Sequence, residues 1–64
     1  MYKIVEVVGR SPNGYGEATQ DAVDGVIRSG ETVHYFEVVE HRGAVRENKS
    51  IEYQAVVKVG VVAK

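Results

Sequence analysis

The chain has 64 residues, with 8 Lys and Arg against 9 Asp and Glu, so its formal net charge is -1. This length predicts a single domain over residues 1–64. The near-neutral charge argues against a dedicated nucleic-acid binder, and the absence of Cys excludes disulfides, thiolate zinc sites and Cys nucleophiles. No apolar run approaches the ~18 residues of a membrane helix, and a charge appears too early for a secretory signal. We therefore expect a cytoplasmic protein.

The first predicted elements are a strand and a helix. β-branched residues dominate residues 2–8, which we predict to form a strand ended by Gly9. After a loop over residues 9–14, the spacing of apolar residues predicts a helix over residues 15–29. Its apolar residues form two neighbouring i, i+4 rows, made of Ala18, Ala22 and Val26 and of Val23 and Ile27. The buried stripe is built from small residues, so a sheet can approach this helix closely.

Two further strands complete the chain. Residues 33–45 read as a long strand, and Gly43 is the predicted position of a bulge or kink. Residues 47–49 form the predicted turn. Residues 51–63 then show the clearest pattern, with apolar residues at every odd position and mostly polar residues between them. The last two strands should form an antiparallel hairpin.

The predicted fold is α+β, a β-α-β-β subunit whose three-stranded antiparallel sheet carries one helix on one face. A chain of this size buries only ~60% of its unfolded surface and is marginal alone, and no disulfide is present to support it. One helix cannot cover both faces of the sheet, and identical subunits are the simplest cover for the rest. The apolar positions expected to remain uncovered are Val5 or Val7, Val38, Val56 and Val62.

No motif for catalysis emerges. The dinucleotide fingerprint fails because Thr19 stands where the third Gly belongs, and Tyr15 occupies the Lys position of a phosphate loop. His34 and His41 are seven residues apart on one strand, so they should face opposite sides, and no third metal ligand lies at a useful spacing. No acid/base pair can be argued. A binding or storage role therefore leads an enzymatic one.

One cluster has the chemistry of a binding site for a planar ligand. Tyr35 and Phe36 can stack on a flat ring, and Gln54 offers both a donor and an acceptor to the edge of a heterocycle. Arg42 adds a planar cation suited to carbonyl oxygens or phosphate. Aromatic residues on strands are more often part of a core, so this pattern alone does not establish a site.

The same residues carry a resemblance that runs over residues 1–62 without an evident gap. The chain resembles the dodecin family in the order and spacing of several segments, namely Tyr2-Lys3-Ile4-Val5-Glu6, Gly9, Ser11-Pro12-Asn13-Gly14, Phe36-Glu37-Val38-Val39-Glu40, Arg42-Gly43, Tyr53-Gln54 and Lys58-Val59-Gly60. The resemblance implies a sheet wrapped around its helix and assembly into a hollow dodecamer with 23 symmetry. It also implies non-catalytic binding of FMN, riboflavin or FAD, in pairs stacked between aromatic side chains of two subunits.

The resemblance assigns roles to individual residues. Tyr35 stands where the family usually has the stacking Trp, and Gln54 matches the Gln that bonds the flavin pyrimidine edge. Arg42 matches an Arg that influences flavin orientation, and Lys3 matches a basic position linked to coenzyme A in some relatives. A second basic position of that coenzyme A site is Gly25 here, which weakens the expectation of coenzyme A binding.

Two questions follow from these assignments. Tyr has a smaller ring than Trp, so we expect flavin affinity to be lower, about tenfold or more. The alternative to flavin storage is a structural or storage shell that binds flavin weakly and binds another ligand such as coenzyme A.

A geometric question concerns Tyr35 and Arg42. A regular strand would place them on opposite faces, so both can reach one ligand only through a bulge or a second subunit.

Overall fold

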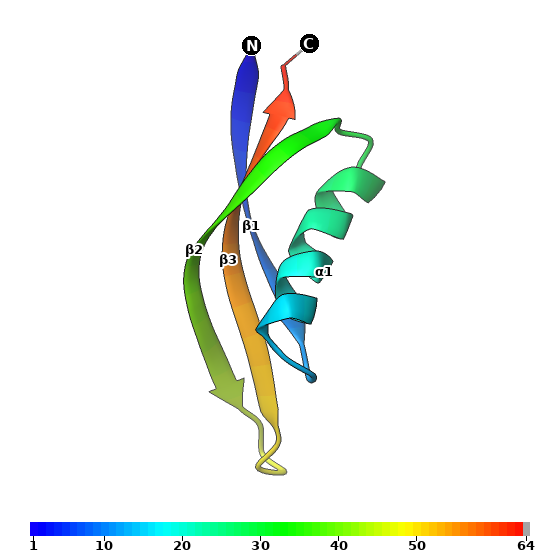
Figure 1. Ribbon diagram of the computed structural model, residues 1–64. Helices are drawn as coiled ribbons and strands as arrows, with labels where there is room; N and C mark the ends of the chain where they lie inside the picture. The colour runs from blue at the N-terminus through cyan, green and yellow to red at the C-terminus, as the bar shows by residue number, and fades with distance from the viewer. Residues whose placement is uncertain (64) are drawn as a thin grey trace.

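The computed structural model describes residues 1–63, in the order β1 (Tyr2–Ser11), α1 (Tyr15–Arg28), β2 (Val33–Val45) and β3 (Ile51–Val62). The strands form one antiparallel sheet in the order β1-β3-β2. Figure 1 shows α1 lying along one face of a long, bent sheet, with the β2–β3 turn at one end of the molecule. The predicted β-α-β-β fold and its antiparallel hairpin are confirmed.

β1 is longer than predicted, because Gly9 continues the strand instead of ending it. Gly9 pairs with Ala55 of β3, and the ladder runs on to Ser11. A Cβ at Gly9 would overlap the main-chain carbonyl oxygen of Ala18 and crowd Ala22. The missing side chain is therefore what lets α1 approach the sheet closely at this point.

α1 contacts the sheet through its row of small residues. Ala18, Ala22 and Val26 are buried, as predicted, whereas Ile27 of the second row is half exposed. The helix ends one residue earlier than predicted, and the Ser29 hydroxyl donates a hydrogen bond to the Val26 carbonyl oxygen at 2.6 Å. Over residues 1–63, no helix has both the length and the apolar character needed to cross a membrane.

The core is built on the odd-numbered residues of β3. Ala55, Val57, Val59 and Val61 are completely buried beneath α1, which confirms the period-2 pattern predicted for this strand. Burying one Val side chain fully contributes about 1.5–3 kcal/mol. The central position of β3 thus gives the subunit most of its buried apolar contacts.

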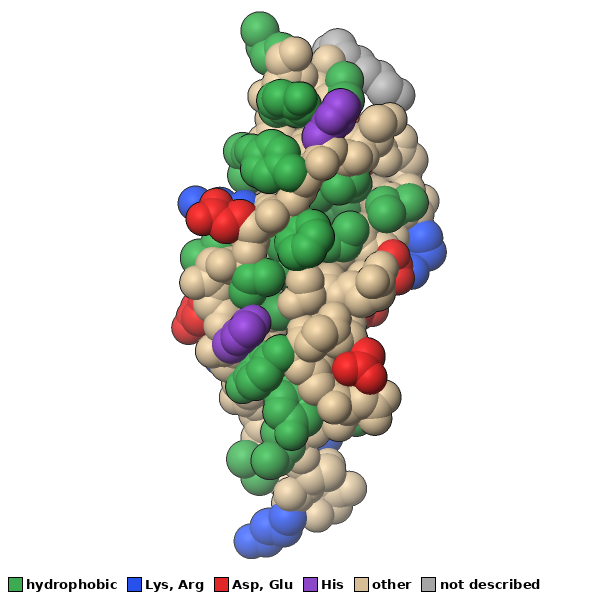
Figure 2. All heavy atoms as spheres, viewed as in Figure 1, with side chains coloured by type: hydrophobic (Ala, Val, Ile, Leu, Met, Phe, Trp, Pro, Cys, Tyr) green, Lys and Arg blue, Asp and Glu red, His purple; other side chains and the backbone are tan. Residues whose placement is uncertain are grey.

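Much apolar surface stays outside this core. Large hydrophobic side chains that are at least one-third exposed occur on every element, among them Tyr2, Ile4, Val8, Ile27, Tyr35, Phe36, Val38, Val39, Val45 and Ile51. Figure 2 shows hydrophobic side chains following most of the length of one face. The prediction of uncovered apolar residues was right for Val38 but wrong for Val56, which is 7% exposed, and Val5, Val7 and Val62 are only partly exposed.

β2 contains two bulges, and neither is at Gly43. The pairing of β2 with β3 slips between Val33 and Tyr35 and again between Val38 and Glu40, whereas Gly43 pairs regularly with Tyr53. The predicted bulge at Gly43 was therefore wrong. Gly43 is needed for another reason: a Cβ there would press on the Glu52 carbonyl oxygen of the neighbouring strand at 3.0 Å.

Candidate functional site

Three of the residues predicted to bind a ligand share the sheet face that points away from α1, which we call the open face. The odd residues of β3 point into the core, so Gln54 and Gly60 lie on the opposite side. Tyr35 pairs with Gly60 and Arg42 pairs with Gln54, so both side chains also belong to this face. From β1, the open face carries Tyr2, Ile4, Glu6, Val8 and Arg10.

The bulge at Val39 explains how Tyr35 and Arg42 share a face. Seven residues separate them, which in a regular strand would place them on opposite sides. The register slip between Val38 and Glu40 leaves Val39 as an extra residue and reverses the alternation beyond it. β2 thus contains a bulge between Tyr35 and Arg42, four residues before the predicted position at Gly43.

The bulge does not bring the two side chains close together. Their partners Gly60 and Gln54 are six residues apart on β3, which corresponds to about 20 Å along a strand. Within one subunit, a ring system that stacks on Tyr35 cannot also reach Gln54. A ligand that touches both needs Tyr35 from one copy and Gln54 from another.

Tyr35 sits in a small aromatic group at the end of the open face where β1 begins. Its ring lies across Gly60, and a Cβ at that position would overlap the ring. Tyr2 meets it edge-on, with ring centroids 6.0 Å apart and an interplanar angle of 88°. His34 packs against Tyr2 with centroids 5.0 Å apart. Tyr35 itself remains 45% exposed, so the ring is available for stacking on a planar partner.

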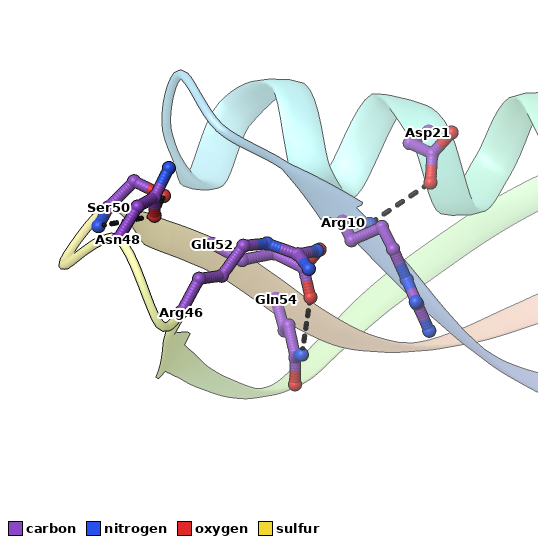
Figure 3. Close-up of polar contacts among 7 residues, drawn as sticks. All are labelled: Arg10, Asp21, Arg46, Asn48, Ser50, Glu52 and Gln54. Atoms are coloured by element: carbon purple, nitrogen blue, oxygen red, sulfur yellow. Dashed lines mark hydrogen bonds and ion pairs between the residues drawn. The ribbon is translucent and has the colours of Figure 1, made fainter.

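Gln54 is held by hydrogen bonds at both ends of its amide. Its Oε1 accepts a bond from Arg42 Nε at 3.0 Å, and its Nε2 donates to Glu52 Oε1 at 2.9 Å. Figure 3 shows the Gln54–Glu52 contact at the end of the sheet near the β2–β3 turn. These bonds fix which end of the amide is the acceptor, and Oε1 keeps a second lone pair for a ligand donor.

Glu52 anchors this network and is 8% exposed. The hydrogen bond from Gln54 lowers the pKa of the Glu52 carboxyl, and burial partly opposes this effect. The hydrogen bond and positive charge of Arg46 and the charge of Arg10 then lower the pKa further. The carboxylate is therefore ionised at neutral pH, and it keeps Gln54 oriented.

Sequence reasoning missed Tyr2, Arg10 and Glu52. Tyr2 and Arg10 come from β1, and they reach the open face near the other residues only through the pairing of β1 with β3. Glu52 follows the polar alternation of β3, and its two-residue distance from Gln54 places both side chains on one face. That spacing was the one signal in the sequence that could have identified it.

Lys3 lies away from these residues. It pairs with Val61, so it belongs to the helix side of the sheet, where its Nζ forms an ion pair with Glu31 at 3.5 Å. The two histidines contact different sides, as predicted: His34 packs on Tyr2, and His41 stacks on Tyr15 of α1 with centroids 4.4 Å apart. Among residues 1–63, no three acidic or His side chains gather into a group that could hold a metal ion.

Two surface hollows flank α1. One, of about 350 Å³, lies against β1, and the other, of about 330 Å³, lies next to Phe36 of β2. Neither is lined by Tyr35, Arg42 or Gln54. These three residues are therefore displayed on a sheet surface, not in either of these hollows, and a second copy would have to supply the other wall of a pocket.

The fold is that of a known class of small oligomeric binding proteins. The family model described as Dodecin matches residues 1–64. The chain is 40% identical to dodecin from Thermus thermophilus over 60 residues, which cover 94% of this chain and 87% of that one. The chain therefore belongs to the dodecin family, whose members are homo-oligomeric, non-catalytic proteins that bind small molecules.

Solved structures agree with this family. The crystal structure of the tt0972 protein from Thermus thermophilus matches with a TM-score of 0.86 and 37% identity, covering 100% of this chain and 96% of that one. The calcium dodecin of Mycobacterium tuberculosis, described as having a novel calcium-binding site, matches with a TM-score of 0.90 and 25% identity, covering 100% of this chain and 91% of that one.

Proposed function

We propose that this protein is a cytoplasmic, non-catalytic flavin-binding protein that stores or sequesters FMN or riboflavin in stacked pairs within a dodecameric shell. One observation carries the proposal. An exposed aromatic ring, Tyr35, and an oriented amide, Gln54, share the open face but lie too far apart to serve one ligand within a subunit. This arrangement suits a site that two copies complete.

The residues of the open face fit a flavin. Tyr35 offers a ring face for stacking on the isoalloxazine system. Gln54 accepts a hydrogen bond from the pyrimidine N–H, and Arg42 donates to Gln54 and lies beside it to tune the orientation of the ligand. The bound flavin supplies absorption of blue light and a site for electrons. The protein supplies stacking, orientation and exclusion of water.

The exposed apolar surface supports assembly. Phe36, Val39, Val45 and Ile51 are each at least half exposed in the subunit. A monomer with such a surface is prone to associate, and a closed shell of identical copies covers it. The dodecamer implied by the family resemblance is our proposal for the form of that shell.

The second candidate is a storage shell whose main ligand is not flavin. The observation that favours it is Tyr35, whose ring is smaller than the Trp expected there. Coenzyme A is the candidate ligand, and Lys3 is its expected contact. The Lys3 side chain is 57% exposed but is paired with Glu31, so a coenzyme A phosphate would have to compete with that carboxylate.

Titration of FMN and riboflavin into purified protein, followed by flavin fluorescence, tests the proposal together with native mass spectrometry. We expect quenching on binding, a twelve-subunit mass and an even number of flavins per shell. Coenzyme A titrated by calorimetry discriminates the second candidate. An unquenched flavin signal at high protein concentration, with heat released only by coenzyme A, would replace the first proposal with the second.

A further inference from the structure

Arg10 lies in a single row with the two polar residues already placed in the site. It pairs with Gln54 across the β1–β3 ladder, and Arg42 pairs with the same Gln54 across the β2–β3 ladder. We call Arg10, Gln54 and Arg42 the arginine row. Neighbouring strands lie about 4.8 Å apart, so the two guanidinium groups start from opposite sides of one amide.

The arginine row presents a fixed order of hydrogen-bonding groups. Gln54 Nε2 is engaged by Glu52, so the amide shows its Oε1 acceptor to a ligand. Guanidinium groups are donors only. The row therefore reads donor, acceptor, donor across the three strands. An imide edge, in which a ring N–H lies between two carbonyl groups, reads acceptor, donor, acceptor, and is its complement.

Arg10 is placed to take part. Its backbone N–H donates to Asp21 Oδ2 at 3.0 Å, which ties the end of β1 to α1. Within residues 1–63, its guanidinium makes no hydrogen bond and no ion pair. Figure 3 shows the Arg10 and Gln54 side chains projecting to the same side of the sheet, away from α1.

The charges and side chains around the arginine row suit a ligand with an electron-rich edge. Arg46 is paired with Glu52, and Glu40 lies on the next row of the open face. That next row also contains Val8 and Val56. Val8, which is 41% exposed, thus offers apolar surface next to the two cations, where the body of a flat heterocycle would lie.

We infer that Arg10 is a specificity-determining residue of the ligand site, and that with Gln54 and Arg42 it reads the imide edge of the ligand. This inference rests on the proposed function and deepens it. It restricts the ligand class to flat heterocycles with a carbonyl, N–H, carbonyl edge. A hydrogen bond from a charged donor changes affinity by about tenfold or more.

The test compares riboflavin, N3-methylriboflavin and FMN on the intact assembly. Riboflavin carries no charge, so attraction of a phosphate does not contribute. We expect Arg10→Gln to weaken riboflavin binding by about tenfold, with little further effect on N3-methylriboflavin, which lacks the imide N–H and should already bind weakly. Lys58→Gln, on the same face but opposite Glu6 and Glu37, is the matched control and should change neither.

Each other outcome is decisive. If Arg10→Gln binds riboflavin with the same affinity as the unaltered protein, the inference is overturned and the proposed function stands. The same holds if Arg10→Gln loses equal affinity for riboflavin and for N3-methylriboflavin. A loss confined to FMN makes Arg10 a phosphate contact and also overturns it. If the unaltered protein binds no riboflavin, the proposed function fails and the inference fails with it. Should Arg10→Gln not assemble, Arg10→Lys, which keeps the charge but loses the planar fork, should still show a measurable loss for riboflavin only.

Discussion

The ring of Tyr35 on β2 lies directly over Gly60 on β3, in the space that a Cβ at Gly60 would fill. The missing side chain of Gly60 thus leaves the space in which the Tyr35 ring packs. Tyr2 closes the other side with an edge-on contact. The position of the exposed ring is set by two neighbours, one of which contributes by having no side chain.

Gly60→Ala should therefore displace the Tyr35 ring and weaken flavin binding. The new methyl group would occupy the place of the ring, and a small shift of a stacking partner forfeits much of the contact energy. We expect a loss of about tenfold in affinity, equivalent to ~1.4 kcal/mol, measured by fluorescence titration. Gly25→Ala is the control, since a Cβ there would come no closer than 3.9 Å to the Arg28 side chain. Unchanged affinity in Gly60→Ala would show that the packing of Tyr35 on Gly60 has no role in flavin binding.

Tyr35→Trp should tighten flavin binding, because a larger ring adds stacking area. Aromatic pairs contribute about 0.5–1.5 kcal/mol beyond area burial, so we expect a gain approaching tenfold, and Tyr35→Ala should lose at least as much. Tyr15→Trp enlarges a ring on the helix side, where Tyr15 stacks on His41, and should leave affinity unchanged. If both Trp variants bind alike, Tyr35 is not the stacking residue.

The stability of the protein should fall in acid partly through Glu52. The pKa of Glu52 is lower in the folded protein than its usual value of 4.5. Its contribution to stability is therefore complete above that value and is lost as the pH falls through the lower folded pKa. Urea midpoints measured at constant protein concentration should show a deficit of Glu52→Gln at pH 7 that narrows below pH 4.5. Glu47→Gln, in the exposed turn, is the control, and a deficit independent of pH would contradict the linkage.

Gly9 should be among the least tolerant positions of the chain. A side chain there would overlap the main-chain oxygen of Ala18, which has no freedom to move. Gly9→Ala should separate α1 from β1 and lower the thermal midpoint, whereas Gly16→Ala, where no atom lies within 4 Å, should raise helix stability by ~1 kcal/mol. Calorimetry of both variants gives the comparison, and a Gly9→Ala midpoint equal to that of the unaltered protein would refute the close approach.

The sequence predicts the parts of this fold that depend on local pattern. The odd residues of β3 predict the core because apolar residues occupy every second position along the strand. The small residues of α1 predict a close contact between helix and sheet. Ile27 of the second helical row is half exposed, because the sheet covers the row of Ala18, Ala22 and Val26 instead. The prediction that Gly9 ends the first strand was wrong, because the glycine is there to let α1 approach β1 closely, and that contact depends on the packing of the helix on the sheet.

The candidate site was only partly predictable for a related reason. Tyr35, Arg42 and Gln54 carry recognisable chemistry, so residue type identifies them. Arg10 does not stand out until the β1–β3 register places it beside Gln54. The bulge at Val39 lies between Val38 and Glu40, without a glycine to signal it, because the slip is set by the pairing of β2 with β3 along its whole length.

Because of that bulge, the number of residues in β2 decides which of its side chains lie on the open face. Removing Val39 would restore plain alternation, turn Arg42 toward α1 and bring His41 to the outside, although every remaining side chain would keep its identity. A scan of point substitutions would never reveal this dependence. In this protein, a one-codon deletion in β2 would remove Arg42 from the open face in a single step and leave Arg10 of β1 as the only cation of the arginine row.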